Sequence, residues 1–555
     1  MNIREINSLV ELFFYKIKEV DNKKYFLQWL KQSKDHKYTW KEVEEKILKL
    51  SQKIKTLINE GDRCLLLSEN RPEWLIADLA IMNAGGITVP IFTTYAPNDY
   101  EHIINDCSPS LVLVSNNNQY NKIRNFVKDK KIISFEEIDS ESFETKYIYQ
   151  NNTGEKINNN LKRKTPACII YTSGTSGNPK GVVLSHGGIL SNCEGSMSLL
   201  RPIVKKDKPV FLTWLPLSHS YEHTVQFIQI MLGAKIFYAE SLEKLISNML
   251  IAKPTIMTAV PRFYQNLFNK INLNFDKQTG IKKILIFKTI ELGKKILRRE
   301  EFTISEKIVN YLCNNFVRRT VKKQFGGKLK AFISGGGALD QNIGEFLNAI
   351  GLPTLQGYGL TEASPVVSCN HLHLVKVETV GKPFRTNKVK IAHDGEILVK
   401  GENIMIGYWN KKNETKEILN DGWLHTGDIG EIDSEGYLKI TDRKKDIIVN
   451  HGGDNISPSK VENILCLNEN IKQSFVYGDK KNYLTAIIVT ESKNKEKIKM
   501  IIENINKNLT LIEKVKKFIT ISEEFTIENR MLTPTLKLKR KEIIKNYKHQ
   551  LENLY

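Results

Sequence analysis

Short apolar runs alternate with helical patterns through the first part of the chain. Five runs have the length and composition of β-strands: residues 63–67, 110–114, 210–213, 330–334 and 395–399. Strands that alternate with helices are typical of an α/β protein. The longest apolar stretch, residues 75–92, is interrupted by Asp78, Asn83 and the Gly85-Gly86 pair, so it predicts a buried helix, turn and strand rather than a membrane span. We therefore expect a large N-terminal domain of layered α/β subdomains over residues 1–440.

The pattern changes from about Gly430. A strand-like stretch over 436–440 is followed by a run of charge at 441–446. After it come an apolar triplet, a Gly452-Gly453 turn and a helix start at Ser457-Pro458. This order is typical of a hinge that leads into a small α+β domain of roughly a hundred residues. We predict a hinge over 441–446 and a small mobile C-terminal domain over 447–555.

A helical and basic insertion is expected over about 272–325. Lys and Arg fill most positions between apolar residues at near-helical spacing, which are Ile281, Ile284, Leu285, Leu292, Ile296 and Leu297, then Ile308, Val309, Leu312, Phe316, Val317 and Val321. Such helices can lie on an anionic membrane surface. Their more common role is to turn the apolar side to the core and the charged side to solvent. The pattern leaves both alternatives open.

Composition narrows the class of protein. A chain of 555 residues exceeds one typical core. Its seven scattered cysteines form no Cys-x-x-Cys, which favours a reducing cytoplasm over a disulfide or zinc framework. The first twenty residues carry charges throughout and lack the apolar core of a signal peptide. The net charge of +20 comes without a nucleic-acid-binding signature, so we expect a lysine-rich solvated surface and no nucleic-acid partner.

Residues 171–180, Tyr-Thr-Ser-Gly-Thr-Ser-Gly-Asn-Pro-Lys, carry the strongest chemical signal. They follow an apolar run at 168–170, so a buried strand is expected to end in a flexible turn. Backbone N–H groups and hydroxyls in such a turn can surround phosphate oxygens, and a lysine adds a point charge. A Ser/Gly linker is the plain alternative, but it gives no reason for the strand-like lead-in. A Walker A loop is excluded because Gly-x-x-x-x-Gly-Lys-Ser/Thr is absent. The predicted phosphate contacts are Thr172, Ser173, Gly174, Thr175, Ser176, Gly177 and Lys180.

Four further motifs follow in order along the chain. They are Leu-Pro-Leu-Ser-His at 215–219, Ser-Gly-Gly-Gly-Ala at 334–338, Gln-Gly-Tyr-Gly-Leu-Thr-Glu at 356–362 and Gly-Trp-Leu-His-Thr-Gly-Asp at 422–428. Singly, each could be a turn or a helix cap. Together they resemble the acyl-adenylate-forming superfamily of acyl-CoA synthetases, luciferases and peptide-synthetase adenylation domains. The resemblance runs from about residue 35 to 545.

The resemblance implies a role for each motif. The loop at 172–180 would hold the phosphates of ATP, and Glu362 and Thr175 would hold Mg²⁺. Tyr358 would stack on adenine, Thr361 would contact phosphate, and Asp428 would take both ribose hydroxyls with help from Arg443. Lys445 would be the hinge pivot. The remaining residues implied for nucleotide or coenzyme A binding are Gly335, Gly336, Gly337, Ala338, Gln356, Gly357, Gly359, Ile440, Gly452 and Gly453.

The catalytic lysine implied by the resemblance lies near the C-terminus. Members of the superfamily commonly show Pro…Gly-Lys there, whereas this chain reads Leu-Thr-Pro-Thr-Leu-Lys-Leu-Lys at 532–539, with Leu536 in the place of the glycine. A Thr-Pro-Thr form is common in fatty-acyl-type synthetases. The choice lies between Lys537 and Lys539, and position relative to the proline favours Lys537.

One further string has two interpretations. Residues 219–223 spell His-x-x-Glu-His, the order found in one class of zinc metallopeptidases. The lead-in at 215–218 is instead similar to long-chain acyl-CoA synthetases, which implies that His219 lines the acyl pocket near the reacting carboxylate. We expect no zinc here.

The resemblance implies a two-step reaction that uses ATP, Mg²⁺ and coenzyme A. A long-chain fatty acid would form acyl-AMP with release of pyrophosphate, and coenzyme A would then take the acyl group. Three features resemble the long-chain subgroup: the 215–219 string, the helical insertion and the Thr-Pro-Thr ending. The alternatives are an acyl-AMP ligase that serves a carrier protein, a synthetase for aryl or shorter acids, a catalytically inactive binding protein, or a membrane or nucleic-acid tether. A cytoplasmic protein with peripheral contact to the inner membrane surface is expected, and the sequence leaves the oligomeric state open.

Overall fold

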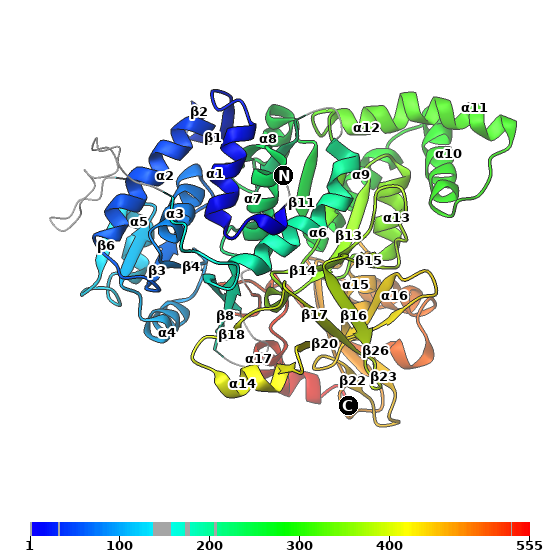
Figure 1. Ribbon diagram of the computed structural model, residues 1–555. Coiled ribbons are helices and arrows are strands. Elements are labelled where there is room, and N and C mark those ends of the chain that lie inside the picture. The colour runs from blue at the N-terminus through cyan, green and yellow to red at the C-terminus, as the bar shows by residue number, and fades with distance from the viewer. Residues whose placement is uncertain (1–2, 32–33, 137–156, 173–177, 205–207, 534–535) are drawn as a thin grey trace.

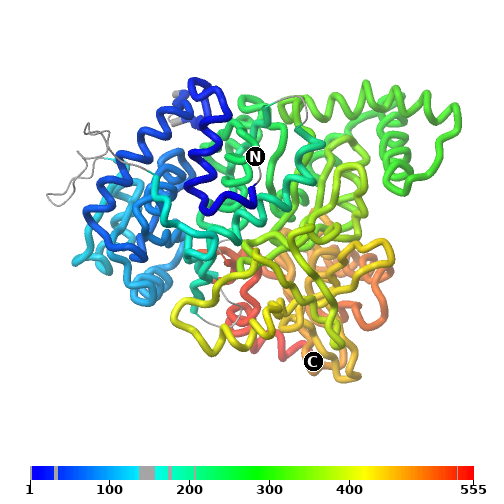
Figure 2. The backbone as a smooth tube through the Cα atoms, viewed as in Figure 1, coloured from blue at the N-terminus to red at the C-terminus, as the bar shows by residue number. Residues whose placement is uncertain are grey.

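The computed structural model describes residues 3–31, 34–136, 157–172, 178–204, 208–533 and 536–555. Of the predicted phosphate loop, Ser173, Gly174, Thr175, Ser176 and Gly177 lie outside the described residues. Figure 1 shows a large body that carries the N-terminus, a helical arm projecting from it, and a C-terminal part packed below. Figure 2 shows the same path, with the orange and red C-terminal segment at the lower right.

Two large sheets form the body. The first has nine strands, and its six central strands, from β13 to β1, run parallel. In spatial order the strands are β15 (Lys382–Pro383), β14 (Val366–Cys369), β13 (Thr354–Gly359), β12 (Ala331–Ser334), β11 (Ile256–Ala259), β9 (Val210–Thr213), β10 (Lys235–Tyr238), β1 (Tyr25–Lys31) and β2 (Lys34–Thr39).

The second sheet has seven strands, five of them parallel. In spatial order they are β18 (Gly407–Tyr408), β8 (Lys180–Ser185), β7 (Pro166–Thr172), β4 (Ile87–Ile91), β3 (Arg63–Leu67), β5 (Leu111–Val114) and β6 (Lys131–Ser134). The edge strands β8 and β18 pair antiparallel. This antiparallel edge brings residues 407–408 next to 182–183, although more than two hundred positions separate them in the sequence.

Alternating side chains fix the layers of the body. On β3, Cys64 and Leu66 face a core shared by both sheets, whereas Leu65 and Leu67 face a separate core under α4 and α5. The shared core also contains residues of α3, α6 and α7, so these helices lie between the two sheets. A third core packs α8, α9 and α13 on the outer face of the nine-stranded sheet.

The helices of the body connect the strands of both sheets. They are α1 (Leu9–Glu19), α2 (Trp40–Lys55), α3 (Pro72–Asn83), α4 (Pro97–Cys107), α5 (Asn117–Ile123), α6 (His186–Val204), α7 (Ser220–Leu232), α8 (Leu245–Ala252), α9 (Pro261–Asp276) and α13 (Gln341–Ala349), with the 3₁₀ turns η1 (Ile3–Glu5) and η4 (Thr361–Ala363). Asp340 caps α13 by accepting hydrogen bonds from the backbone N–H groups of Asn342 and Ile343.

A third, antiparallel sheet links the body to the C-terminal part. Its strands are β16 (Asn387–Ile391), β17 (Glu396–Gly401), β20 (Trp423–Ile432), β19 (Leu419–Asn420) and β21 (Leu438–Arg443), with α14 (Lys412–Ile418) beside it. Strand β21 runs three residues beyond the expected strand end at 440, because Arg443 pairs in register with Asp428 on β20. Only residues 444–446 of the expected hinge form a turn.

The C-terminal part contains a hairpin and a three-stranded sheet. The strands are β22 (Ile448–Val449), β23 (Asn455–Ile456), β24 (Gln473–Tyr477), β25 (Leu484–Val489) and β26 (Val515–Ile521), and the helices are α15 (Pro458–Leu465), α16 (Lys495–Asn506), the 3₁₀ turn η5 (Leu511–Glu513) and α17 (Arg540–Glu552). Its apolar residues form clusters separate from the cores of the body. The mixed α/β class with a large N-terminal and a small C-terminal part is thus as predicted.

The helical insertion forms an arm of α10 (Gly280–Leu297), α11 (Ile304–Cys313), a π-helical turn η3 (Asn314–Arg318) and α12 (Arg319–Lys323) (Figure 1). The periodic apolar residues do not all face the core. Leu292, Val317 and Val321 are buried, whereas Ile281, Ile284, Ile308 and Phe316 are exposed. The more common arrangement, with the apolar side turned inward, therefore describes only part of this insertion.

Candidate active site

The two ends of the predicted phosphate loop lie side by side. Strands β7 and β8 pair antiparallel with Thr172 opposite Lys180, and the cross-strand bonds hold both residues in place. The ammonium of Lys180 lies 5.2 Å from the centre of the Tyr408 ring, within the range of a cation–π contact. Tyr408 reaches this position because β18 pairs with β8 at the sheet edge.

Tyr408 contacts Glu362 as well as Lys180. The Tyr408 hydroxyl donates to Oε1 of Glu362 at 2.8 Å, and the backbone carbonyl of Glu362 accepts from the N–H of Met405. The preceding residue, Thr361, shares a hydrogen bond of 3.0 Å with the hydroxyl of Ser220, the first residue of α7. The 3₁₀ turn η4 therefore presents a carboxylate and a hydroxyl beside the end of the phosphate loop.

A glycine-rich strand end borders the site. β12 ends at Ser334, and the N–H of Gly335 donates to the carbonyl of Ala259 on the neighbouring strand. A Cβ at Gly335 would come within 2.9 Å of the Tyr221 ring, and Gly336 has a φ of +80°. Both positions therefore favour glycine. Parallel pairing of β12 with β13 sets Ser334 opposite Gln356, whose Oε1 accepts from the N–H of Leu339.

Asp428 is a buried carboxylate with two partners. Its Oδ2 accepts from the Tyr358 hydroxyl at 2.7 Å, and its Oδ1 lies 3.3 Å from Nε of Arg443. Burial raises the pKa of Asp428 above its usual range, and the Arg443 charge works against that rise. The aspartate on β20, the arginine on β21 and the tyrosine on β13 thus converge although they come from three separate motifs.

Lys537 joins these groups from the C-terminal segment. The charges of Arg443, Asp428, Glu362 and Asp446 all act on its ammonium. The side chain keeps contact with solvent, but protein atoms crowd the ammonium, and this burial, aided by the Arg443 charge, lowers its pKa. The backbone of Lys537 is held by Thr533, which exchanges main-chain and hydroxyl hydrogen bonds with it.

Leu536, which stands where related sequences commonly have glycine, has a φ of +62°. This left-handed conformation explains the preference for glycine at this position, because a side chain is strained there. Leu536 adopts this conformation despite its side chain, and the Lys537 ammonium lies within range of the charges of Asp428 and Glu362. Pro534 and Thr535 lie outside the described residues.

Family models match most of this chain. The AMP-binding enzyme model matches residues 18–409, and the AMP-binding enzyme C-terminal domain matches residues 445–555. The chain belongs to the AMP-binding enzyme family.

Named relatives cover nearly the full length. The chain is 27% identical over 540 residues to the long-chain-fatty-acid–CoA ligase FadD15 of Mycobacterium bovis, covering 90% of this chain and 88% of that protein. It is 30% identical over 557 residues to long-chain-fatty-acid–CoA ligase 5 of Rattus norvegicus, covering 88% and 79%. Among solved structures, O-succinylbenzoate coenzyme A synthetase (MenE) of Bacillus subtilis, in complex with ATP and magnesium ion, has a TM-score of 0.72 at 20% identity and covers 96% and 98%. This last likeness concerns the fold.

In this AMP-binding enzyme, the His-x-x-Glu-His string does not gather its side chains around one point. His219 caps α7, and its Nδ1 accepts from the N–H of Tyr221 at 3.1 Å. Glu222 accepts from the Thr258 hydroxyl, and His223 contacts Asp78 at 2.8 Å. Burial, followed by the nearby Lys537 charge, lowers the pKa of His219 to about 3, so this imidazole is neutral at physiological pH.

The residues expected at the hinge and in the remaining nucleotide or coenzyme A contacts lie on β21, in the turn after it and in the β22–β23 hairpin. Lys445 is in the exposed turn after β21, and Ile440 lies within β21 opposite Gly430. Gly452 and Gly453 form the exposed turn of the β22–β23 hairpin, near the lower end of the molecule in Figure 1. Among the described residues, no hydrogen bond or ion pair joins this hairpin turn to Asp428, Glu362 or Lys537.

Sequence reasoning missed three residues that the structure places at or near the site. Tyr408 bonds Glu362, Ser220 bonds Thr361, and Gln265 on α9 donates its side-chain amide to the carbonyl of Cys466 in the C-terminal part. Ser220 is an unspecified position of the His-x-x-Glu-His string, and Tyr408 and Gln265 belong to no motif with a chemical signal. Their roles depend on pairings between distant segments, which a local pattern does not contain.

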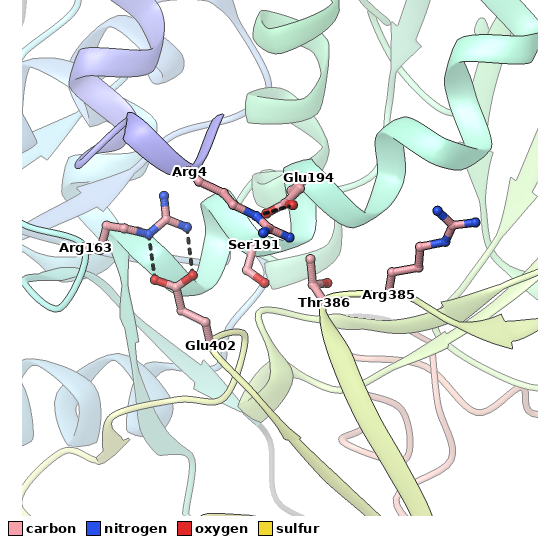
Figure 3. Close-up of a pocket in the computed structure, with 7 residues that line it drawn as sticks. All are labelled: Arg4, Arg163, Ser191, Glu194, Arg385, Thr386 and Glu402. Atoms are coloured by element: carbon pink, nitrogen blue, oxygen red, sulfur yellow. Dashed lines mark hydrogen bonds and ion pairs between the residues drawn. The ribbon is translucent and has the colours of Figure 1, made fainter. Parts of the chain in front are cut away.

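A pocket of the AMP-binding enzyme is lined by arginines and glutamates and contains none of the predicted site residues (Figure 3). Arg163 forms a two-pronged contact with Glu402 at 2.6 and 2.8 Å, and Arg4 contacts Glu194 at 2.9 Å. Arg163 also donates to the carbonyls of Ile3 and Ile6. The paired charges anchor the N-terminal segment to the body, and they explain this cluster without a ligand.

Proposed function

We propose that this protein activates a long-chain fatty acid with ATP and passes the acyl group to coenzyme A. The acid and ATP give acyl-AMP and pyrophosphate, and acyl-AMP and coenzyme A then give acyl-CoA and AMP. The observation that carries the first step is the position of Lys537. This lysine comes from the C-terminal part, yet its ammonium lies within reach of the charges of Glu362 and Asp428 on the body.

The first step needs a positive charge beside the α-phosphate of ATP. A carboxylate is a poor electrophile because attack on it must expel an oxide, whereas AMP is a good leaving group. A preorganised cation stabilises the charge that develops on the α-phosphate. We assign this role to Lys537. Magnesium, held by Glu362 and Thr175, would supply further charge stabilisation at the phosphates.

The charged and aromatic residues of the candidate site suit a nucleotide. Lys180, Arg443 and Lys537 are three cations beside the carboxylates of Asp428, Glu362 and Asp446, and their ammonium and guanidinium groups can contact phosphate oxygens. Asp428 offers carboxylate oxygens to a ribose diol, and Tyr358 offers a ring for adenine. Thr361 and the loop from Thr172 to Lys180 would contact the phosphates, and residues 335–338 and 356–359 would border the base and the acyl group.

The acyl specificity rests on the relatives. Proteins named long-chain-fatty-acid–CoA ligases align with about nine-tenths of this chain. Because Nδ1 of the neutral His219 accepts from Tyr221, its Nε2–H can donate a hydrogen bond beside the expected acyl pocket without repelling the positive lysine. We propose that it lies next to the reacting carboxylate.

The second step requires coenzyme A to reach the same carbonyl. We propose that the domain over 447–555 rotates about a hinge at 441–446, with Lys445 as pivot, so that Lys537 withdraws and the Gly452-Gly453 turn approaches. The contact of Gln265 with the Cys466 carbonyl would break in this movement. We propose a cytoplasmic location with peripheral contact to the inner membrane surface; among the described residues, no helix is long and apolar enough to cross a bilayer.

Pyrophosphate release across a series of fatty and aryl acids tests the proposal, with thioester formation measured with and without coenzyme A. We expect the highest kcat/KM for long-chain acids and thioester only when coenzyme A is present. A preference for aryl or short acids would contradict the substrate class. Acyl-AMP that accumulates and is not taken by coenzyme A would instead favour an acyl-AMP ligase.

A further inference from the structure

The helical arm, residues 280–323, exposes large apolar side chains on three of its elements. Seven of them are between 60% and 84% exposed: Ile281, Ile284 and Phe287 on α10, and Ile304, Ile308, Tyr311 and Phe316 on α11 and η3. On α11 the spacing 304, 308, 311 places three of them on one helix face. Cys313 and Val317, on the opposite side, are buried. The arm therefore has an inward apolar face that packs and an outward apolar face that does not.

The inward face holds the arm firmly to the body. Gly293 of α10 packs so closely on α13 that a Cβ would lie 2.4 Å from Cα of Ala349. The buried guanidinium of Arg318 donates to the carbonyls of Ala349 and Thr289 and to the side-chain oxygens of Asn310 and Asn314. These contacts fix the arm against α13. The outward side chains are therefore exposed while the arm is folded and packed on the body.

A second apolar stripe lies on the neighbouring α8 and the segment just before it. Leu242, Ile246 and Leu250, four residues apart, are exposed together with Ile251. α8 adjoins the end of the arm, since Gly326 contacts the backbone of Met249 and Lys253, and both elements share the third core. Figure 1 shows α8, α12 and α11 along the same upper edge of the molecule. An apolar surface divided over these elements is larger than isolated exposed residues would form.

The net charge of the arm indicates which kind of partner this apolar surface binds. Residues 280–323 contain twelve Lys or Arg and four Glu, a net charge of +8 out of +20 for the whole chain. A second copy placed face to face would bring the same charge against itself, because a twofold interface repeats one patch on both subunits. An anionic lipid surface complements the charge and accepts the apolar side chains.

We propose that the outward face of the arm, together with the α8 stripe, docks on an anionic lipid bilayer. The exposed side chains would insert at the boundary between headgroups and acyl chains, and the lysines and arginines between them would contact lipid phosphates. The proposal identifies the surface behind the peripheral association proposed above. It does not depend on the proposed reaction, since binding to vesicles requires neither ATP nor fatty acid.

Flotation of the full chain with vesicles tests this surface. The wild type is expected to bind phosphatidylglycerol-containing vesicles at low salt, to bind pure phosphatidylcholine weakly, and to dissociate as salt rises. The triple variant Ile304→Ser, Ile308→Ser, Phe316→Ser should bind at least about tenfold more weakly, since each lost side chain removes apolar area from the interface. The control Leu374→Ser, Met500→Ser, Leu511→Ser changes three exposed apolar residues outside the arm and α8 and should bind like the wild type.

A second variant protects the test against misfolding. Lys282→Gln, Lys283→Gln, Lys307→Gln leaves the apolar face intact and should weaken binding to anionic vesicles severalfold while flattening the salt dependence. Absence of wild-type binding, or equal binding by the apolar triple variant, would overturn the proposal. A dimer in sedimentation velocity that the apolar variant abolishes would assign the face to a second copy and would equally overturn it. Pyrophosphate release from a detergent-dispersed acid should be unchanged in all variants, so a failed docking proposal stays distinct from a failed reaction.

Discussion

The hydroxyl of Tyr408 donates a hydrogen bond of 2.8 Å to the carboxylate of Glu362, while the ring of the same tyrosine lies 5.2 Å from the Lys180 ammonium. One side chain thus contacts both the expected magnesium ligand and the lysine at the end of the phosphate loop. Tyr408 stands on a two-residue edge strand that pairs with β8, and its backbone N–H donates to the Thr415 hydroxyl. We infer that Tyr408 positions Glu362.

Replacing Tyr408 by phenylalanine keeps the ring and removes the hydroxyl. Because Glu362 then loses a hydrogen bond that orients its carboxylate, the Mg²⁺ concentration for half-maximal pyrophosphate release should rise about five- to tenfold, with a smaller fall in the rate at saturating Mg²⁺. Tyr437→Phe is the matched control, since Tyr437 also lies under lysine ammonium groups and donates its hydroxyl to the Leu374 carbonyl, outside the site. An unchanged Mg²⁺ dependence in Tyr408→Phe would remove the positioning role.

Lys537 and Lys539 allow a direct comparison of neighbouring lysines. Lys537→Ala should lower adenylation by about a hundredfold or more, because a cation aimed at the transition state is lost. It should spare thioester formation from supplied acyl-AMP, which needs the rotated domain. Lys539→Ala should leave both steps near the wild-type rate, since Lys539 is the N-cap residue that precedes α17 and its N–H donates to the Met531 carbonyl. Single-turnover measurements of each half-reaction separate these outcomes. Equal loss of both steps in Lys537→Ala would overturn its assignment.

The short motifs predict a phosphate and nucleotide site because each is a local arrangement of glycines, hydroxyls and charges. Tyr358, Asp428 and Arg443, which the resemblance assigns to one nucleotide, contact one another in the structure, and the five predicted strands all form. Tyr408 could not be found in this way, since its role depends on pairing between β18 and β8. The arm shows the same limit: the period of its apolar residues predicts helices, but which face is covered depends on the distant Ala349 and on what docks outside.

Acid should destabilise the fold through a buried histidine. Burial lowers the pKa of His186 to about 3, and its Nδ1 accepts from the N–H of Leu9. In the unfolded chain the imidazole has an ordinary pKa near 6.5, so the unfolded state binds more protons between about pH 3 and 6.5. Stability from this group is therefore full above about pH 6.5 and falls as pH drops, by up to about 1.4 kcal/mol per pH unit.

His186→Gln should shrink the difference between the melting temperatures at pH 7 and pH 5, because the glutamine does not titrate and its side-chain oxygen can accept the same bond. His393→Gln, at an exposed turn, serves as the control and should keep the wild-type difference. Scanning calorimetry at the two pH values gives both numbers. A His186→Gln protein with the full wild-type difference would show that other groups cause the acid sensitivity.

The hinge can be tested at one backbone position. Lys445 lies in the exposed turn where the N–H groups of Asp446 and Ile447 donate to the Arg443 carbonyl, and the N–H of Lys444 donates to the Gly427 carbonyl. Proline at 445 would fix its own φ and restrict Lys444, so rotation about this turn should become harder while the present arrangement, with Lys537 in the site, is kept. Lys445→Pro should therefore lower thioester formation about tenfold or more and pyrophosphate release much less, as expected for a step gated by domain movement. Lys445→Ala removes the same side chain without restricting the backbone and should retain both rates. Pyrophosphate release and thioester formation are measured separately in both variants. Equal impairment of the two half-reactions in Lys445→Pro would place the pivot elsewhere, as would an equal loss of thioester formation in Lys445→Ala.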